Sequence, residues 1–261
     1  KKIIMTKEDE ENFKASNECH ICNKKYDKNY KDKVRDHDHL TGHYKGSAHK
    51  KCNTKFYYER KLNVFFHNLK GYDSHFLIQE IGKFNKKMSV LPNNTEKFLS
   101  FSIDNINFKD TLQFMPDILE NLTKNLVKKE LNEENSNVFK YLSNTFQGEK
   151  LELLKKKGIF PYDYLVSFDR FNETKLPNKE AFYNILQNTN VSDEDYNHAL
   201  KVWETFEMKT FGDYHDIYLK SDVLLLADIF ENFRSLCLDY YKLDPVHYYG
   251  TPGIAWDACL E

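Results

Sequence analysis

The sequence lacks any run of 18 apolar residues, and its start, KKIIMTKEDEENF, lacks both a long apolar stretch and a small-residue cleavage site. These absences predict no membrane-spanning helix and no secretory signal peptide. The sequence also lacks an initiator methionine at position 1, so we expect a fragment or a chain preceded by further residues. With 261 residues and 40% hydrophobic content, it can form one large domain, or one domain plus a small one.

The chain has few cysteines, and their number is odd. The five cysteines are Cys19, Cys22, Cys52, Cys237 and Cys259, and the first three lie beside histidines. An odd count in this arrangement favours metal binding over disulfides. We therefore expect a reducing, intracellular compartment, without distinguishing nucleus, organelle and viral replication site.

Charge is balanced over the whole chain but not along it. Residues 1–61 carry 16 Lys and Arg against 10 Asp and Glu, whereas the remainder carries 22 against 30. The basic excess surrounds the histidine- and cysteine-rich segment. This distribution suits a DNA phosphate backbone as partner. A solvated, lysine-rich surface is the alternative.

Two pairs of metal-ligand residues stand 26 residues apart. The first pair is Cys19 and Cys22, and the second is His49 and Cys52. Thiolate and imidazole ligands together prefer zinc in a tetrahedral site, so the spacing predicts a structural Zn²⁺. The surrounding segment is polar and loop-rich, and zinc binding would supply free energy of folding that it otherwise lacks. The alternative is a set of free cysteines near unrelated histidines.

A second cluster, Asp36-His37-Asp38-His39, lies between these two pairs, and Asn53 follows the last cysteine. Carboxylate and amide oxygens are ligands for a hard cation, so Asp36 and Asn53 could hold Mg²⁺. His37 would then activate a water for attack on a phosphate.

The CxxC, DHDH and HxxCN motifs together resemble recombination endonuclease VII and its His-Asn-His, ββα-metal relatives over about 40 residues. The resemblance implies zinc on the four ligands, Mg²⁺ on Asp36 and Asn53, and His37 as general base. The sequence departs from the pattern at His49, where that endonuclease has a third cysteine. A zinc knuckle that contacts DNA, with Asp and His side chains holding the loop, is the alternative.

Hydrophobic periodicity changes at Leu62 and predicts an α/β or α+β domain. Residues 62–68 read as a buried strand and residues 71–84 as a helix. Segments around 88–91, 97–103 and 106–110 read as strands, with a turn at Asp104-Asn105. Three further helices are expected over 115–129, from the N-cap Ser192 to Phe206, and over 212–241.

Two motifs in this second part resemble a polymerase family. HNLKGYDSHF, residues 67–76, is similar to the second exonuclease motif of family B DNA polymerases, and YLKSDVLLLADIF, residues 218–230, to the third. GIFPYDYL, SDEDYNHALKVWETF and HYYGTPGIAWDACL also resemble the protein-primed, organellar and viral branch carried by Maverick/Polinton-type elements. The resemblance extends from about residue 12 to residue 261.

This second resemblance implies a 3′–5′ proofreading domain of ribonuclease H-like fold that uses Mg²⁺ or Mn²⁺. Its expected partners are a single-stranded 3′ end or primer-template DNA, and a terminal priming protein. The implied roles are metal binding by Asp73 and Asp222, water orientation by Tyr218, and DNA contact by Asn68, Thr111 and Leu112.

Parts of that enzyme are missing from the sequence. It contains no hydrophobic strand with the Asp-x-Glu of the first exonuclease motif, and no polymerase motif. We therefore expect a polymerase fragment that neither polymerises nor proofreads alone. The expected segments are a lead-in at 1–17, a zinc module at 18–60, an incomplete exonuclease-like domain at 61–245, and the start of a palm at 246–261. A stand-alone endonuclease VII-like enzyme and a non-catalytic DNA-binding module are the alternatives.

Overall fold

The structure is a computed structural model that describes residues 2–27, 31–38, 41–58, 62–83, 86–92, 98–132, 137–186 and 188–260. Its backbone contacts divide the chain into two compact units. Unit 1 comprises Lys1–Val64, Ile81–Val90 and Phe101–Phe108, and unit 2 comprises Phe65–Glu80, Leu91–Ser100 and Lys109–Glu261. The sequence-based boundary between residues 60 and 61 stays a prediction.

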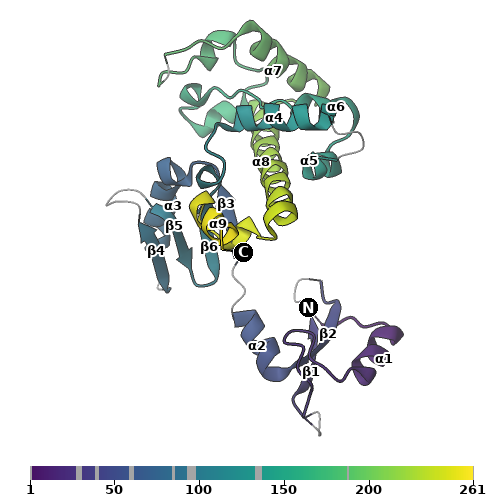
Figure 1. The fold of residues 1–261 in the computed structure, drawn as a ribbon. Helices are drawn as coiled ribbons and strands as arrows, with labels where there is room; N and C mark the ends of the chain where they lie inside the picture. The colour runs from purple at the N-terminus through teal and green to yellow at the C-terminus, as the bar shows by residue number, and fades with distance from the viewer. Residues whose placement is uncertain are drawn as a thin grey trace. The chain divides into compact units, whose positions relative to one another are not determined.

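Helices and strands alternate in the first part of the chain, and helices dominate the second part (Figure 1). The strands are β1 (Lys33–His37), β2 (Tyr44–His49), β3 (Leu62–Phe66), β4 (Met88–Pro92), β5 (Phe98–Ile103) and β6 (Ile106–Asp110). The helices are α1 (Lys7–Ala15), α2 (Lys50–Tyr58), α3 (Asp73–Ile81), α4 (Leu119–Asn132), α5 (Lys140–Thr145), α6 (Gly148–Leu154), α7 (Asp193–Thr205), α8 (Phe211–Tyr241) and α9 (Thr251–Ala258). The predicted mixture of α and β structure is confirmed, and the ribonuclease H-like topology stays a prediction.

The first 58 residues contain a β-hairpin that the sequence analysis missed. Strands β1 and β2 pair antiparallel, and α2 packs against both of them. Helix α1 begins at a capping box, in which Thr6 and Asp9 each bond the other's backbone N–H, and it contacts β2. A buried cluster of Cys19, Tyr26 and Ala48 fills the interior of this lobe. The strands were missed because this core comes from a few small and metal-ligand residues instead of an alternating apolar pattern.

A four-stranded sheet with the order β3-β6-β5-β4 follows in the chain. The predicted turn at Asp104-Asn105 connects β5 to β6, and Asp104 adopts a positive φ of 49°. Phe101 and Phe108 stack across this hairpin with ring centroids 4.7 Å apart. The four predicted strands are therefore present, within one to two residues of their expected bounds.

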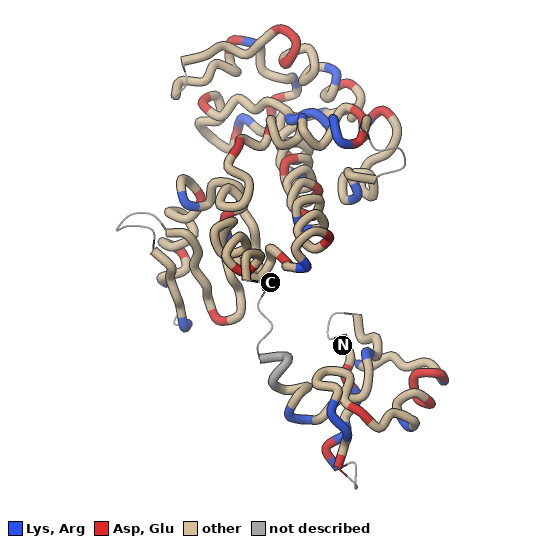
Figure 2. The backbone as a smooth tube through the Cα atoms, viewed as in Figure 1, with Lys and Arg blue, Asp and Glu red and all other residues tan. Residues whose placement is uncertain are grey.

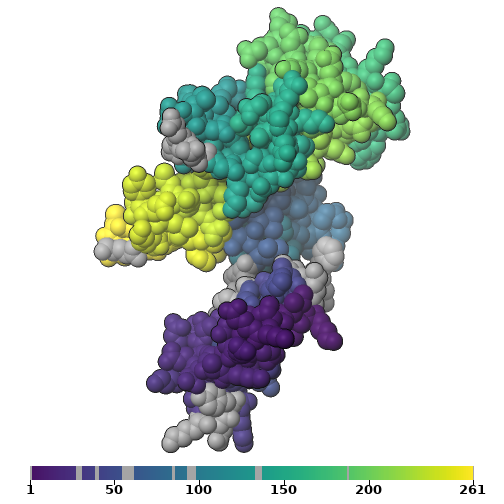
Figure 3. Space-filling view, turned by 90° about the vertical axis from the view of Figure 1, so that its right-hand side faces the viewer, coloured from purple at the N-terminus to yellow at the C-terminus, as the bar shows by residue number. Residues whose placement is uncertain are grey.

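Helix α8 is the central element of unit 2. One apolar cluster joins it to α4, α5 and α6 through residues that include Leu126, Leu142 and Leu225. A second joins it to α6 and α7 through residues that include Val202 and Phe211. In the space-filling view these teal and green segments pack against one another (Figure 3). The side chains of Phe65 and Phe114 both contact Phe230 of α8.

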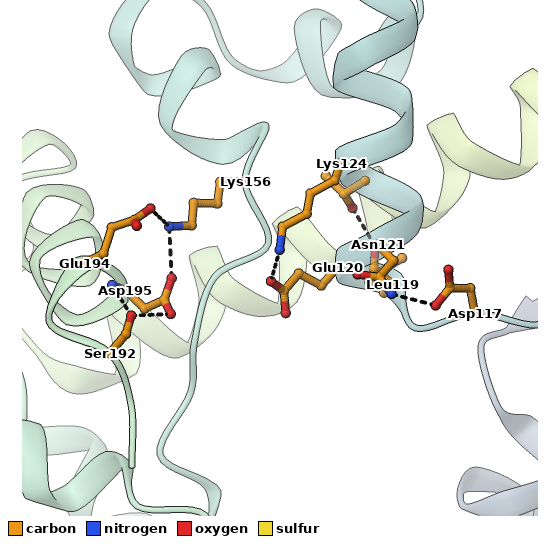
Figure 4. A network of polar contacts seen from close by, with 10 residues as sticks. Asp117, Leu119, Glu120, Asn121, Lys124, Lys156, Ser192, Glu194 and Asp195 are labelled. Carbon is orange, nitrogen blue, oxygen red and sulfur yellow. Dashed lines mark hydrogen bonds and ion pairs between the residues drawn. The ribbon is translucent and has the colours of Figure 1, made fainter. Parts of the chain in front are cut away.

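Polar side chains define where two helices start (Figure 4). Ser192 caps α7 as predicted, since its hydroxyl accepts from the Asp195 backbone N–H at 3.0 Å. Lys156 bonds Glu194 and Asp195 in the first turn of the same helix. Helix α4 begins at Leu119, four residues later than expected, and the Asp117 carboxylate before it accepts from the Ile118 backbone N–H. None of the helices in the described ranges has the length and apolar character of a membrane span.

Candidate metal centre

The first pair of predicted zinc ligands lies on a tight turn. The backbone N–H of Cys19 donates to the Lys24 carbonyl at 3.0 Å, and that of Asn23 donates to the Cys19 carbonyl at 2.8 Å. Asn23 closes the turn in the left-handed region, with a φ of 55°, which asparagine tolerates better than most residues. This geometry directs both cysteine side chains to the same side of the turn.

The second pair comes from the junction of β2 and α2, and the four predicted ligands meet. The ligand atoms of Cys19, Cys22, His49 and Cys52 all lie within 4.8 Å of one another. His49 Nδ1 lies 3.5 Å from Cys22 Sγ and 3.8 Å from Cys52 Sγ. Such spacing suits tetrahedral ligands around one ion, with Zn–S near 2.3 Å and Zn–N near 2.0 Å. The Cys₃His donor set therefore fits a structural zinc ion.

The pKa values of two thiols in this cluster are shifted in opposite directions. Burial raises the pKa of the Cys19 thiol, but backbone N–H groups of His49, Cys22 and Ile21 outweigh burial and lower it to about 7. Burial and the neighbouring thiols raise the pKa of Cys52 to about 11. The cluster thus disfavours a second negative charge until a dication compensates it.

A carboxylate lies behind the imidazole ligand. His49 uses Nδ1 towards the sulfur atoms, and its other nitrogen, Nε2, lies 3.8 Å from Asp32 Oδ2. Metal-binding histidines commonly have a carboxylate or carbonyl on the nitrogen that faces away from the metal, and this partner selects the tautomer. The sequence analysis missed Asp32, because no ligand spacing marks it.

The predicted magnesium ligands each have a buried oxygen atom without a hydrogen-bond partner. Asp36 lies on β1 with 1% of its surface exposed, and Asn53 lies in the first turn of α2, which contacts β1. Asp36 Oδ1 and Asn53 Oδ1 each have no hydrogen-bond partner, although both atoms are buried. Buried polar atoms are almost always bonded, so two orphaned oxygen atoms of this kind fit the ligands of a hard cation.

The strand carrying Asp36 is irregular at the next residue. The register of the β1–β2 pair shifts between Asp36 and His37, and His37 pairs with Tyr44. Bulges of this kind redirect a side chain, and they are common beside functional sites. Asp38 holds the following turn, because its carboxylate accepts from the Thr41 backbone N–H at 3.1 Å and binds Lys45. His39, the last member of the motif, lies outside the described residues.

The residues assigned to an exonuclease site all belong to unit 2. The Asp110 carboxylate, which is fully buried, accepts from the backbone N–H groups of Asn68, Lys70 and Leu112 at 2.9 to 3.1 Å. It thereby attaches the loop after β3 to the end of β6. Asn68 adopts a left-handed φ of 68° within this loop. Asp110 was not predicted from the sequence, although it accepts all three of these backbone hydrogen bonds.

Three predicted residues flank this carboxylate. Thr111 is fully buried and donates to the Phe66 carbonyl at 2.9 Å, so a bond from its hydroxyl to DNA would require breaking that contact. Leu112 follows Thr111, and its backbone N–H donates to Asp110 Oδ1. Asp73 is the first residue of α3; burial raises the pKa of its carboxyl, its own backbone N–H opposes the shift, and Asp110 adds to it. The roles of all three in binding DNA or metal stay predictions.

Tyr218 and Asp222 share one face of α8, and a lysine joins them. Lys157 Nζ lies 2.6 Å from the Tyr218 hydroxyl and 2.7 Å from Asp222 Oδ2. The Tyr162 hydroxyl lies 2.6 Å from that of Tyr218. Burial raises the pKa of Asp222 while Lys157 lowers it, and Asp222 Oδ1 is buried without a partner. Burial also raises the pKa of Tyr218, so this phenol stays protonated.

No described contact joins Asp73 to Asp222. Among the residues that the structure describes, the Cys19, Cys22, His49 and Cys52 cluster is the one group of three or more metal-binding side chains within reach of a common ion. A shared metal site on Asp73 and Asp222 therefore stays a prediction.

The family model of recombination endonuclease VII matches residues 2–65. This match covers the hairpin, the zinc-ligand cluster, and both candidate magnesium ligands. It leaves most of unit 2 unmatched. No curated protein and no solved structure matches the chain. The endonuclease VII-like segment is thus the part of the chain with a known relationship, and no finding supports the predicted family B polymerase.

Proposed function

We propose that the endonuclease VII-like segment is a Mg²⁺-dependent DNA endonuclease stabilised by a structural zinc. The observation that carries the proposal is that Asp36 Oδ1 and Asn53 Oδ1, on the contacting elements β1 and α2, are both buried without a hydrogen-bond partner. Most buried oxygen atoms have a bonding partner, and a hard cation would supply the partner that both of these atoms lack. Asp38 differs from Asp36, because its carboxylate accepts from the Thr41 backbone N–H and stabilises the turn.

In this proposal each residue has a separate chemical role. Asp36 and Asn53 would hold the cation, which when bound would polarise the phosphate as a Lewis acid and stabilise charge on the leaving oxygen. His37 accepts a proton from the water that attacks phosphorus. The new bond joins the water oxygen to phosphorus, and the bond to one ester oxygen of the backbone breaks. The zinc cluster fixes β2 and α2 and takes no part in the reaction.

DNA is the proposed partner because of the charge around this site. Exposed basic side chains include Lys24, Lys25, Lys31, Lys50 and Lys51. Figure 2 marks the basic positions of this segment in blue. Ammonium groups at these positions would contact phosphates and make binding depend on salt concentration, without reading the base sequence.

Nicking of supercoiled plasmid and cleavage of a branched duplex by the whole chain test the proposal. We expect cleavage with Mg²⁺ and none with EDTA. His37→Ala should reduce the rate by about 100-fold or more, since it removes the general base. His75→Ala is the matched control, because His75 is exposed on α3 and has no role in the proposal. Equal Mg²⁺-dependent rates for wild type and His37→Ala would disprove the mechanism.

A second candidate function concerns residues 65–260. We propose that this region binds the 3′ end of single-stranded DNA, as a fragment or a decayed form of a family B polymerase exonuclease domain. Support comes from the quoted motifs and from Asp222 Oδ1, a buried acceptor without a partner beside Tyr218. A native reading frame with an upstream Asp-x-Glu strand and a downstream palm would favour the fragment, and a terminal priming protein would then be a further partner.

Fluorescence anisotropy with a single-stranded oligonucleotide tests this second candidate. Asn68→Gly removes the amide without straining a left-handed backbone, so we expect weaker binding in a folded protein. Asn188→Gly is the matched control, since Asn188 also has a positive φ, of 52°. Identical affinities for wild type and both variants would exclude Asn68 as a DNA contact.

A further inference from the structure

His20 lies between two zinc ligands in the sequence but binds a residue of the other candidate site. Its Nε2 atom lies 2.9 Å from Asp36 Oδ2. A carboxylate can only accept, so the imidazole donates from Nε2. Asp36 is 1% exposed and the side chain of His20 is 33% exposed, so the bond lies at the edge of the lobe interior.

The backbone around His20 is held on the hairpin. The His20 N–H donates to the Ser47 carbonyl of β2 at 2.9 Å. Gly46, the partner of Asp36 in the β1–β2 ladder, leaves room for the ring, because a Cβ at this position would lie 2.7 Å from His20 Cγ. The imidazole therefore packs directly over the strand pair that carries Asp36, and its position depends on the Cys19–Cys22 turn.

The two carboxylate oxygen atoms of Asp36 differ in their bonding. Oδ2 accepts from His20, whereas Oδ1 is buried and has no hydrogen-bond partner. A carboxylate held by one oxygen cannot rotate freely, so the other oxygen keeps a fixed direction. Partners of this kind behind a metal ligand typically change metal affinity by about 10- to 100-fold when removed.

We propose that His20 is a positioning residue through which the zinc-binding turn orients Asp36 for the catalytic cation. This inference rests on the proposed magnesium site and adds a coupling between the two metal centres. Zinc holds Cys19 and Cys22, these cysteines hold His20, and His20 holds Asp36. The proposal requires only a donor at Nε2, whatever the charge of the ring.

Binding of Mn²⁺ to the zinc-loaded whole chain, followed by electron paramagnetic resonance, tests the proposal independently of cleavage. Mn²⁺ prefers the same oxygen ligands as Mg²⁺. We expect His20→Leu to weaken Mn²⁺ binding by about 10- to 100-fold while the protein keeps about one equivalent of zinc. His20→Gln presents an amide N–H near the place of Nε2 and should restore most of the affinity.

Two further variants complete the experiment. Gly46→Ala keeps His20 but places a Cβ 2.7 Å from His20 Cγ and strains the backbone at a φ of 158°, so it should weaken Mn²⁺ binding at least as much as His20→Leu does. Arg35→Gln is the matched control: Arg35 precedes Asp36 on β1 but binds Glu10 at the surface, and its removal should leave the Mn²⁺ affinity at the wild-type value.

Three results would overturn the positioning role of His20. The proposal fails if His20→Leu binds Mn²⁺ as tightly as wild type, or if His20→Gln behaves like His20→Leu. It also fails if His20→Leu loses zinc, because His20 would then serve the zinc turn itself. The proposed function fails separately, if Mn²⁺ binding to the wild type does not depend on Asp36 and Asn53.

Discussion

The Lys157 ammonium lies 2.7 Å from the Asp222 carboxylate, although 65 positions separate them in the sequence. The two side chains are 18% and 22% exposed. Burial raises the pKa of Asp222, and Lys157 lowers it again. Lys157 therefore opposes the effect of burial and favours the charged form of Asp222.

Replacing Lys157 with methionine should lower the free energy of unfolding by about 2 kcal/mol at pH 7, because it leaves a buried carboxylate without its partner. The pKa of Asp222 would rise further in the folded variant. A carboxyl group whose folded pKa exceeds its unfolded pKa destabilises the protein above that range, and the penalty disappears as the pH falls through it. The deficit should therefore shrink between pH 7 and pH 4 in urea unfolding.

Lys201→Met is the control for this measurement. Lys201 pairs with Glu149 at the surface, where both side chains are more than half exposed. Such pairs contribute little to stability. A deficit for Lys157→Met that is equal at every pH would contradict the assigned role of Asp222.

Replacing Asp110 with asparagine should release the loop after β3. The carboxylate accepts from three backbone N–H groups, and an amide has only one acceptor oxygen, so at least one donor would face an NH₂ group. An unsatisfied buried donor costs about 1–3 kcal/mol. Urea unfolding should show this loss, and hydrogen exchange should accelerate at Lys70. Asp239→Asn, on an exposed residue of α8, should change neither quantity.

Local patterns in the sequence predicted much of the fold. The helices α7 and α8 have clear apolar periodicity and a capping residue, Ser192 or Thr210, so their positions follow from local signals. The zinc ligands were predictable for a similar reason, because two short pairs of soft donors bind one ion with few other requirements. Helix α4 was placed four residues too early, because Pro116 is as acceptable in the loop before a helix as in its first turn.

The remaining features depend on contacts between distant residues. Asp110 reaches a loop about 40 positions earlier, and His20 bonds Asp36 on another element. Neither residue has a spacing that identifies its partner, and a single histidine or aspartate has many structural uses. The β1–β2 hairpin was missed because its interior is formed largely by the zinc ligands and Tyr26 instead of apolar strand residues.

Zinc binding should release protons from the thiols. Cys52 has a pKa of about 11 in the cluster, so it carries a proton at pH 7 and must lose it to ligate the metal. Titration of the zinc-free chain with Zn²⁺ in a weakly buffered indicator solution should show at least about one proton released per zinc. Zinc retention should weaken as the pH falls, because protons then compete for the same sulfur atoms. Cys259→Ser, outside the cluster, should behave as wild type, and Cys52→Ser should release fewer protons.

Replacing Asp32 with asparagine should weaken zinc binding without removing a ligand. Asp32 Oδ2 faces His49 Nε2 at 3.8 Å, on the side of the ring opposite the nitrogen that would bind the metal ion. Losing such a partner typically costs about 10-fold or more in metal affinity, because the tautomer and the basicity of the imidazole are no longer controlled. Competition with a chromophoric chelator measures the affinity. Asp27→Asn, on an exposed residue, is the matched control, and equal affinities for the two variants would show that the His49 ring is held by its sulfur neighbours alone.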